Sequence, residues 1–411
     1  MTERREWVPL IVAGLTNAVP VAGVVLFGWS LAPLVLVYWF ELGVALAFAA
    51  VRGLFAQRPP SHPPALLVVG AVRHKRGGIS LPWTDRRVQF ANVPVVALAL
   101  VGFGLVWFVA GVIAFAGLEV GGGGTIEDAA TTGAGFGMLG AVAGHGVDTV
   151  ARYFLAGRDE RVNVQQALQS AIWPILVVGL ALVVCGLVVA TGASTILLLA
   201  GLVTTKCCFD LAGSYRDRLR AFDERTYLTF GWAFDPPTWN PVDADLDGPV
   251  ETVRPHRGAV LLDGVIRGWT SDAMTLVAVL AGSGVVLSLL AGDLGPLFVG
   301  GVPALALLLL LAVLGAVHDA IRFGWLTYRV GDDGVVGVDR LFGRAQWRVP
   351  AWKVERADVE RTLADRLVGT ETLVVSHDDR EIRITNVPDA DALVPDRTPD
   401  AAAVDATAPD S

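Results

Sequence analysis

The stretch that decides the fold is Ala273–Val317, which reads AMTLVAVLAGSGVVLSLLAGDLGPLFVGGVPALALLLLLAVLGAV. Two segments within it, Ala273–Ala291 and Leu297–Val317, contain no charged residue and flank the turn Gly292–Pro296. Each has about 20 residues, the length that a helix needs to cross the hydrocarbon core of a bilayer. We therefore expect a membrane hairpin. Because it has few polar side chains, we expect it to serve as an anchor and not as a transport pathway.

Six further apolar segments of similar length precede this hairpin. They are Val8–Phe27, Leu31–Val51, Val93–Leu118, Thr131–Phe154, Ala171–Ala190 and Thr195–Gly213. The hydrophobic fraction of 53% and the mean hydropathy of +0.55 exceed those of an ordinary soluble domain. We predict an α-helical polytopic membrane protein with eight transmembrane helices.

The basic residues lie on one side of these segments. The connections after the first, third, fifth and seventh segments contain no Lys or Arg, whereas the other side carries Arg4, Arg5 and many later arginines. Short loops rich in Lys and Arg stay in the cytoplasm, so we expect both termini to be cytoplasmic in a multi-pass protein of the cell membrane. The first segment follows two arginines as a signal peptide does, but a second span comes within a few residues. We expect it to remain as an uncleaved span.

The charge balance limits the kinds of partner. The chain has 40 acidic and 32 basic residues, a net charge of −8, and only three lysines, Lys75, Lys206 and Lys353. An acidic surface suits a protein of an extreme halophile, where salt screens electrostatic repulsion, and it makes nucleic acid an improbable partner. The three cysteines lie in apolar segments and no metal-ligand spacing occurs, so we expect no disulfide framework, no metal and no cofactor.

The hydrophobic period changes to about two after the hairpin. Short alternating stretches are separated by Gly and Asp turns, and they are Trp325–Val330, Val335–Val338, Gln346–Val349, Thr372–Val375 and Arg380–Ile384. This pattern predicts a small cytoplasmic domain with an antiparallel sheet. Between Trp325 and Pro388 the basic and acidic residues are interleaved and nearly balanced, which favours docking of protein over binding of anionic lipid.

These observations divide the chain into five regions. We predict a six-helix transmembrane domain over 1–215, a cytoplasmic linker or irregular region over 216–270, the transmembrane hairpin over 271–320, the β domain over 321–394 and a disordered acidic tail over 395–411. We expect the β domain to be a separable folding unit.

Two parts of the chain resemble known families. The stretches Tyr328–Val336, Gln346–Pro350 and Leu363–Val375 are similar to the bacterial pleckstrin-homology-like (PH-like) domain, which commonly follows a membrane hairpin. The N-terminal half resembles a multi-spanning prokaryotic membrane family known as domain of unknown function 6498, through Asn17–Pro20, Gly28–Trp29, Tyr38–Glu41, Gly144–Asp148 and Lys206–Asp210. These resemblances imply an architecture but no reaction.

A few polar residues lie inside the predicted spans. Glu41 is near the middle of its span, and small residues at four-residue steps, Ala45 and Ala49, place it on a face that another helix can approach closely. We expect Glu41 to face the bundle and to be satisfied by Asn17, His145 or Lys206. Asp148 and Arg152 are four residues apart, and so are Lys206 and Asp210. In each pair the two opposite charges can therefore neutralise each other on one helix. The predicted intramembrane polar cluster is Asn17, Glu41, His145, Asp148, Lys206 and Asp210.

Three functions remain open for such a chain. The polar cluster can set helix register in a non-enzymatic envelope, assembly or docking factor, whose partners are the bilayer and other membrane proteins bound by the β domain. It can instead carry protons in a proton-coupled transporter or channel, with Glu41, His145 and Asp148 as relay groups. An intramembrane enzyme is the third alternative. We favour the first because the sequence contains no catalytic motif and we assign no catalytic residue.

Overall fold

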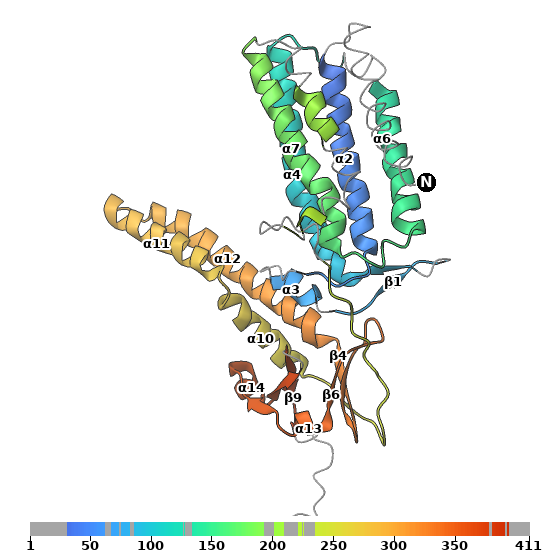
Figure 1. The fold of residues 1–411 in the computed structure, drawn as a ribbon. Helices are drawn as coiled ribbons and strands as arrows, with labels where there is room; N and C mark the ends of the chain where they lie inside the picture. Colours follow the sequence, from blue (N-terminus) through green and yellow to red (C-terminus); the bar gives the residue numbers. More distant parts are fainter. Residues whose placement is uncertain are drawn as a thin grey trace, which may run out of the picture. The chain divides into compact units, whose positions relative to one another are not determined.

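The computed structural model describes residues 31–61, 67–73, 75–82, 86–125, 127, 134–192, 201–208, 221–223, 225, 235–377, 380–390 and 393. The chain forms two compact units (Figure 1). The N-terminal unit contains residues 1–61 and 80–239, and the C-terminal unit contains residues 62–79 and 240–411.

The N-terminal unit is a helical bundle. Its described helices are α2 (Leu31–Phe55), α4 (Val93–Val120, preceded by the 3-10 turn η2, Phe90–Asn92), α6 (Ala134–Asp148), the π-helix η3 (Thr149–Leu155), α7 (Val164–Ala190) and a helix over 201–208. Helix α2 packs against α4, α6 and α7, and α4 packs against α7 (Figure 1). Two short strands, β1 (Gly78–Ser80) and β2 (Arg87–Gln89), lie where the chain passes between the units.

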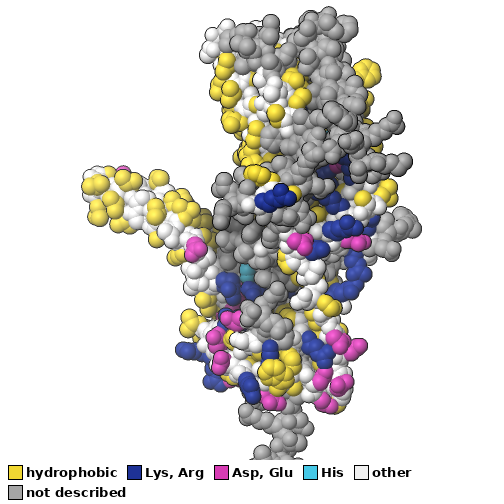
Figure 2. Space-filling view, viewed as in Figure 1, with side chains coloured by type: hydrophobic (Ala, Val, Ile, Leu, Met, Phe, Trp, Pro, Cys, Tyr) yellow, Lys and Arg dark blue, Asp and Glu magenta, His cyan; other side chains and the backbone are white. Residues whose placement is uncertain are grey.

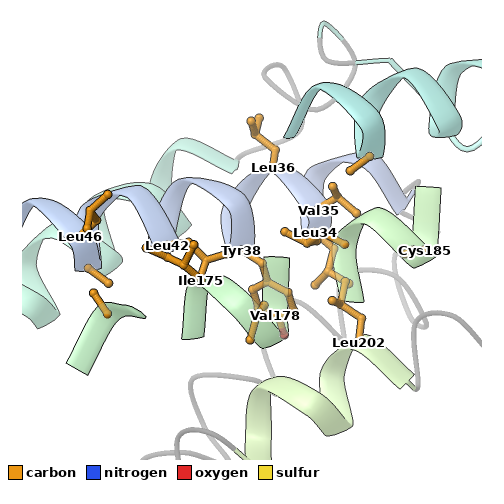
Figure 3. Packing of buried hydrophobic residues seen from close by; sticks show 14 of the residues in the cluster. Leu34, Val35, Leu36, Tyr38, Leu42, Leu46, Ile175, Val178, Cys185 and Leu202 are labelled. Atoms are coloured by element: carbon orange, nitrogen blue, oxygen red, sulfur yellow. The ribbon is translucent and has the colours of Figure 1, made fainter. Parts of the chain in front are cut away.

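The core of this bundle is aliphatic. Side chains of α2, α7 and the helix over 201–208 point toward one another, among them Leu42, Ile175 and Leu202 (Figure 3). Helices α4 and α7 approach closely because both carry glycine at their crossing: a Cβ on Gly186 would lie 2.7 Å from the Cα of Ala114. At the edge of this core the indole rings of Trp39 and Trp107 stack at 4.4 Å, and each Nε1 donates a hydrogen bond to the other residue's carbonyl oxygen.

Five of the described helices are long and apolar enough to span a membrane. They are Leu31–Phe55, Phe90–Val120, Val164–Ala190, Met274–Ala291 and Gly295–Gly324. The predicted count of eight is not confirmed. The segment Val8–Phe27 lies outside the described residues, and only 201–208 of Thr195–Gly213 are described. The segment Thr131–Phe154 changes from α- to π-helix at Thr149, so its α-helical part is short.

The helices of the C-terminal unit include the expected hairpin. Helices α11 (Met274–Ala291) and α12 (Gly295–Asp319) pack together and are joined by a turn in which Gly292 has a φ of +65°. The π-helix η4 (Ala320–Gly324) continues α12. Helices α3 (Leu67–Arg73) and α10 (Arg257–Trp269) pack on α12 as well.

Two antiparallel sheets complete the C-terminal unit. The first has the order β3-β4-β5-β6, with β3 (Glu251–Val253), β4 (Leu326–Gly331), β5 (Gly334–Asp339) and β6 (Arg344–Pro350). The second has the order β7-β8-β9, with β7 (Asp358–Glu360), β8 (Glu371–His377) and β9 (Arg380–Val387). Short helices α13 (Ala351–Val354) and α14 (Leu363–Val368) flank β7. Tyr328, Val335, Val349, Leu373 and Ile384 are buried between the strands, as the alternating pattern predicts.

The compact unit extends beyond the predicted β domain. Within the predicted linker or irregular region over 216–270, residues 251–253 form strand β3 and residues 257–269 form helix α10. Strand β3 pairs with β4 in the register Thr252↔Arg329, and Val260 of α10 lies in the sheet core. The sequence did not reveal these elements because β3 has only three residues and α10 is too short and too charged to be found as an apolar span. A β domain cut at 321 therefore lacks part of its own sheet and core.

Candidate functional site

The polar residues of the N-terminal unit gather between α2, α6 and the helix over 201–208. The Glu41 carboxylate of α2 lies 3.0 Å from the Lys206 Nζ and 3.9 Å from the His145 Nε2, measured from its Oε1 atom. The side chains of Glu41 and His145 are about a quarter exposed, and that of Lys206 is 11% exposed. Three groups that lie far apart in the sequence thus meet at one carboxylate oxygen.

Packing along α2 fixes the position of His145. The imidazole stacks on the Phe48 ring with a centroid distance of 6.3 Å and an interplanar angle of 19°. Glycines on α6 allow this approach: a Cβ on Gly137 would lie 2.9 Å from Val37, and one on Gly146 would lie 3.6 Å from Phe48. The small-residue pattern of α6 therefore serves close contact with α2.

A second polar group lies farther along the same two helices. The Arg52 guanidinium contacts the Asp148 carboxylate at 3.4 Å, the Thr149 hydroxyl at 3.4 Å and the Ser170 hydroxyl at 2.9 Å. The Tyr153 hydroxyl donates a hydrogen bond of 2.6 Å to the Arg52 carbonyl oxygen. Arg52 is buried, so these acceptors replace the water that its charge would otherwise bind.

These two groups lie along one helix–helix contact, which we name the α2–α6 seam and define as Glu41, Phe48, Arg52, His145 and Asp148. The spacings of seven and four residues on α2 and of three on α6 keep each set on one face of its helix. Glu41 and Arg52 are 11 residues apart, which corresponds to about 16 Å along the helix axis. Within the seam and its partner Lys206, each carboxylate has a basic group beside it.

The structure can be compared with the predicted cluster residue by residue. Glu41, His145 and Lys206 come together, and Asp148 contacts both Arg152 on its own helix, at 3.4 Å, and Arg52 on α2. Asn17 and Asp210 lie outside the described residues. Arg52 is absent from the predicted cluster because an arginine at the end of a span was interpreted only as a mark of the cytoplasmic side. Its distance of 11 residues from Glu41 was the signal that both side chains share a face.

Among the residues that the structure describes, no group of three or more His, Cys, Asp or Glu side chains is arranged to bind a metal ion. The seam can instead neutralise charge and exchange protons, through the carboxylates and the imidazole.

The C-terminal unit contains its own buried charges. Lys75 and Asp339 form an ion pair whose side chains are 5% and 1% exposed. Asp365 is buried as well, and it accepts hydrogen bonds from Thr370, Thr372, Asn386 and the backbone nitrogen of Thr362. Burial alone would raise the pKa of Asp365, but these donors stabilise the carboxylate and hold its pKa below the usual value.

Comparison with known families covers both units. The model of a family described as "Family of unknown function (DUF6498)" matches residues 1–226, more than half of the chain. The chain belongs to the DUF6498 family. A second model, described as "Bacterial PH domain", matches residues 273–395. No curated protein and no solved structure matches the chain.

Both predicted resemblances are confirmed by these matches. All residues of the α2–α6 seam, together with Lys206, lie within the part of this DUF6498 protein that the family model matches. The PH-domain match begins at the hairpin and includes strands β4 to β9, whereas β3 and α10 precede it.

Proposed function

We propose that this DUF6498 protein is a non-enzymatic membrane factor that docks another protein on its PH-like unit, at the cytoplasmic face of the cell membrane. The observation that carries the proposal is a set of exposed apolar side chains beside the second sheet. Trp352 of α13 and Val359 of β7 are each 55% exposed, and Leu363 and Leu367 of α14 are 61% and 76% exposed. We name these four residues the docking set.

The strand register of the second sheet indicates on which face of the sheet Val359 lies. Val359 is opposite Leu373, which in turn is opposite Ile384, and both of these partners are buried. Directly opposite residues point to the same face of a sheet. The inner face of the sheet therefore continues past the core at β7, which is the outer strand of the order β7-β8-β9. An outer strand with an open apolar face is suited to receive an extended segment of a partner.

The charges around the docking set favour a protein over a lipid headgroup. Lys353 and Arg356 lie within 6 Å of the Trp352 ring, but Glu355, Asp358 and Glu360 alternate with them. Figure 2 shows the same interleaving of basic and acidic side chains over the visible face of the β-rich part. Recognition of anionic phospholipids requires a basic cluster, whereas a protein interface combines apolar anchors with a mixed polar rim.

The test uses a photo-crosslinking amino acid in the full-length protein in cells. Placed at Trp352 or Leu367 it should give one discrete protein adduct, and placed at Arg344, which is exposed on the first sheet, it should not. The substitution Leu363→Asp should abolish the adduct formed from position 352 because it puts a charge into the apolar set. Lipid adducts at 352 and 367, or a protein adduct that L363D leaves unchanged, would contradict the proposal.

One observation favours the alternative of a proton-coupled transporter. Glu41, His145 and Lys206 meet at a single point between helices, as a relay for protons requires. This function predicts that liposomes containing the protein acidify in response to a proton gradient, and that Glu41→Gln abolishes the flux. Equal flux for the wild type and E41Q would remove the alternative.

A further inference from the structure

Most of the apolar side chains of helix α10 lie on the side that faces away from the rest of the C-terminal unit. In a water-soluble unit, a surface helix places its apolar face on the core and its polar face outward. In α10, the residues toward the rest of the C-terminal unit are small or charged, apart from Val260, which packs in the sheet core. Those on the opposite side are apolar, and they are Leu261, Leu262, Val265, Ile266 and Trp269, which we name the α10 outer face.

The inner face of α10 is fixed by close contacts with α12. A Cβ on Gly264 would lie 2.5 Å from the carbonyl oxygen of Gly315, and Gly268 lies against the Leu311 carbonyl. Arg267 donates a hydrogen bond of 2.9 Å to Asp319, which is 1% exposed. The four-residue step between Gly264 and Gly268 is the small-residue spacing that lets two helices approach closely in membranes.

The inner face also contacts the second sheet. Asp263 accepts a hydrogen bond of 2.7 Å from the Asn386 side chain, and the same nitrogen donates to Asp365 at 3.0 Å. The rotation of α10 about its axis is therefore set on two sides, by α12 and by β9.

The outer face is left uncovered at its two ends. Leu261 is 47% exposed and Trp269 is 43% exposed, and Leu262, Val265 and Ile266 between them are half-buried. At 100° per residue these five side chains share one side of the helix. An apolar stripe of this length facing water is costly, at about 25 cal/mol for each Å² exposed.

The position of α10 along α12 indicates what covers the stripe. The indole Nε1 of Trp269 donates to the carbonyl oxygen of Leu308, so the end of α10 lies beside a part of α12 whose own side chains are apolar and exposed. Leu309, Leu310 and Val313 are each more than half exposed there. In Figure 2 the visible side chains of the hairpin are mostly hydrophobic. The outer face of α10 is thus continuous with the lipid-facing surface of a membrane span.

The length of that span places α10 at the edge of the bilayer. Gly295–Gly324 has 30 residues, which corresponds to about 45 Å of helix against a hydrocarbon core of about 30 Å. Its final third must leave the core at the end opposite the Gly292 turn, and α10 packs along α12 from Leu308 to Asp319, across that edge. Tryptophan is enriched at this boundary because its ring is apolar and its N–H is polar.

We propose that the α10 outer face inserts into the cytoplasmic leaflet, at the boundary between headgroups and acyl chains, and holds the PH-like unit against the bilayer. The ligand is the lipid bilayer itself, bound by apolar burial and not by headgroup charge. This inference is independent of the docking set on α13, β7 and α14.

The test measures the surroundings of single cysteines in the full-length protein in lipid nanodiscs. Cysteines carrying an environment-sensitive fluorophore are placed at Leu262 and Val265, after Cys185, Cys207 and Cys208 are replaced by alanine. Thr252, exposed on β3, is the water-facing control, and Leu289, 79% exposed on α11, is the lipid-facing control. Each variant is compared in thermal unfolding with the unlabelled protein, and two positions on α10 guard against a local perturbation by one label.

The expected result is quenching by lipids that carry a nitroxide near the headgroup, at both α10 positions. It should reach roughly half or more of the quenching at Leu289, since interfacial helices insert only about 5–10 Å. Aqueous iodide should quench the label at Thr252 strongly and the labels on α10 weakly. Strong iodide quenching on α10 means that the face lies in water and overturns the proposal. Protection from both quenchers means that protein covers the face, and it overturns the proposal equally.

Discussion

Lys75 and Asp339 are 264 residues apart in the sequence, yet they form an ion pair in which both side chains are buried. The neighbouring residue Arg76 strengthens the contact, since its backbone nitrogen donates to Gln346 at 2.7 Å and its carbonyl oxygen accepts from the Gln346 amide at 2.9 Å. A segment that precedes α4 in the chain therefore completes the PH-like unit.

The ion pair should respond asymmetrically to substitution. Lys75→Met leaves a buried carboxylate without its cation and should lower the free energy of unfolding of the C-terminal unit by about 3 kcal/mol or more. The double variant K75M/D339L removes both charges and should be clearly more stable than either single variant. Pulse proteolysis of the C-terminal unit over a denaturant series measures these differences. Additive losses in the double variant would show that the two residues do not act as a pair.

A fragment of the β domain alone should fold poorly. Residues 325–394 lack strand β3, the buried Val260 of α10 and the cation that neutralises Asp339. We expect a broad thermal transition by circular dichroism in high salt. A fragment of residues 240–394 in detergent, with a peptide of residues 67–79 added, should unfold more cooperatively. A sharp transition for residues 325–394 alone would contradict this expectation.

Acid should weaken the second sheet through Asp365. The pKa of this carboxyl is lowered in the folded protein, so the group stabilises the fold when it is ionised. This contribution to the free energy of unfolding is complete above 3.8, the ordinary pKa of an aspartate. It is lost as the pH falls through the lowered pKa that Asp365 has in the folded protein. The test compares the unfolding free energy of the wild type with that of Asp365→Asn between about pH 2 and 6. The variant should be less stable at pH 6, and the difference should shrink in acid.

The Glu41 contact with Lys206 should matter for the stability of the membrane bundle. Lys206→Met removes the nearest cation from Glu41 and should destabilise the bundle by on the order of 2 kcal/mol, because an uncompensated carboxylate then remains between the helices. The variants Lys206→Arg, which keeps the charge, and E41Q/K206M, which removes both charges, should recover most of the loss. Thermal unfolding in nanodiscs monitors all three. If K206R is as unstable as K206M, the contribution comes from packing and not from charge.

The orientation in the membrane can be tested by chemical labelling. Single cysteines at Gly122 and Asp293 should react with an impermeant reagent added to intact cells, and one at Asp243 should react only after lysis. A Cβ on Gly122 meets no atom within 4 Å, but the φ of +71° at this position strains any residue that has a side chain. Labelling of position 243 in intact cells would reverse the proposed cytoplasmic location of the PH-like unit.

The elements that could be predicted from the sequence are those with a long, uniform pattern. Apolar runs predicted the hairpin that became α11 and α12, and alternation predicted β4, β5, β6, β8 and β9. Strands β3 and β7 have three residues each, so a period of two has no room to be recognised. Helix α10 was not predicted because it has only 13 residues and its apolar residues are interrupted by Asp263 and Arg267.

The candidate site was predictable only in part, for a related reason. Periodicity showed that Glu41 must face other helices, but it could not choose its partner. That choice depends on how α2, α6 and the helix over 201–208 are packed, and on the glycines of α6 that bring His145 near Phe48. The contact of Arg52 with Asp148 joins residues that are 96 positions apart, a relation that no local pattern contains.

The pairing of β3 with β4 has a consequence for how the chain is threaded through the bilayer. The two strands lie on either side of the hairpin in sequence, and the register Thr252↔Arg329 makes them immediate neighbours. Because a sheet cannot form through a membrane, the chain must cross an even number of times between residues 253 and 326. The backbone hydrogen bonds between β3 and β4 thus require an even number of membrane crossings here, independently of where the arginines lie. An insertion that added one crossing would keep the two strands on opposite sides of the membrane and prevent them from pairing.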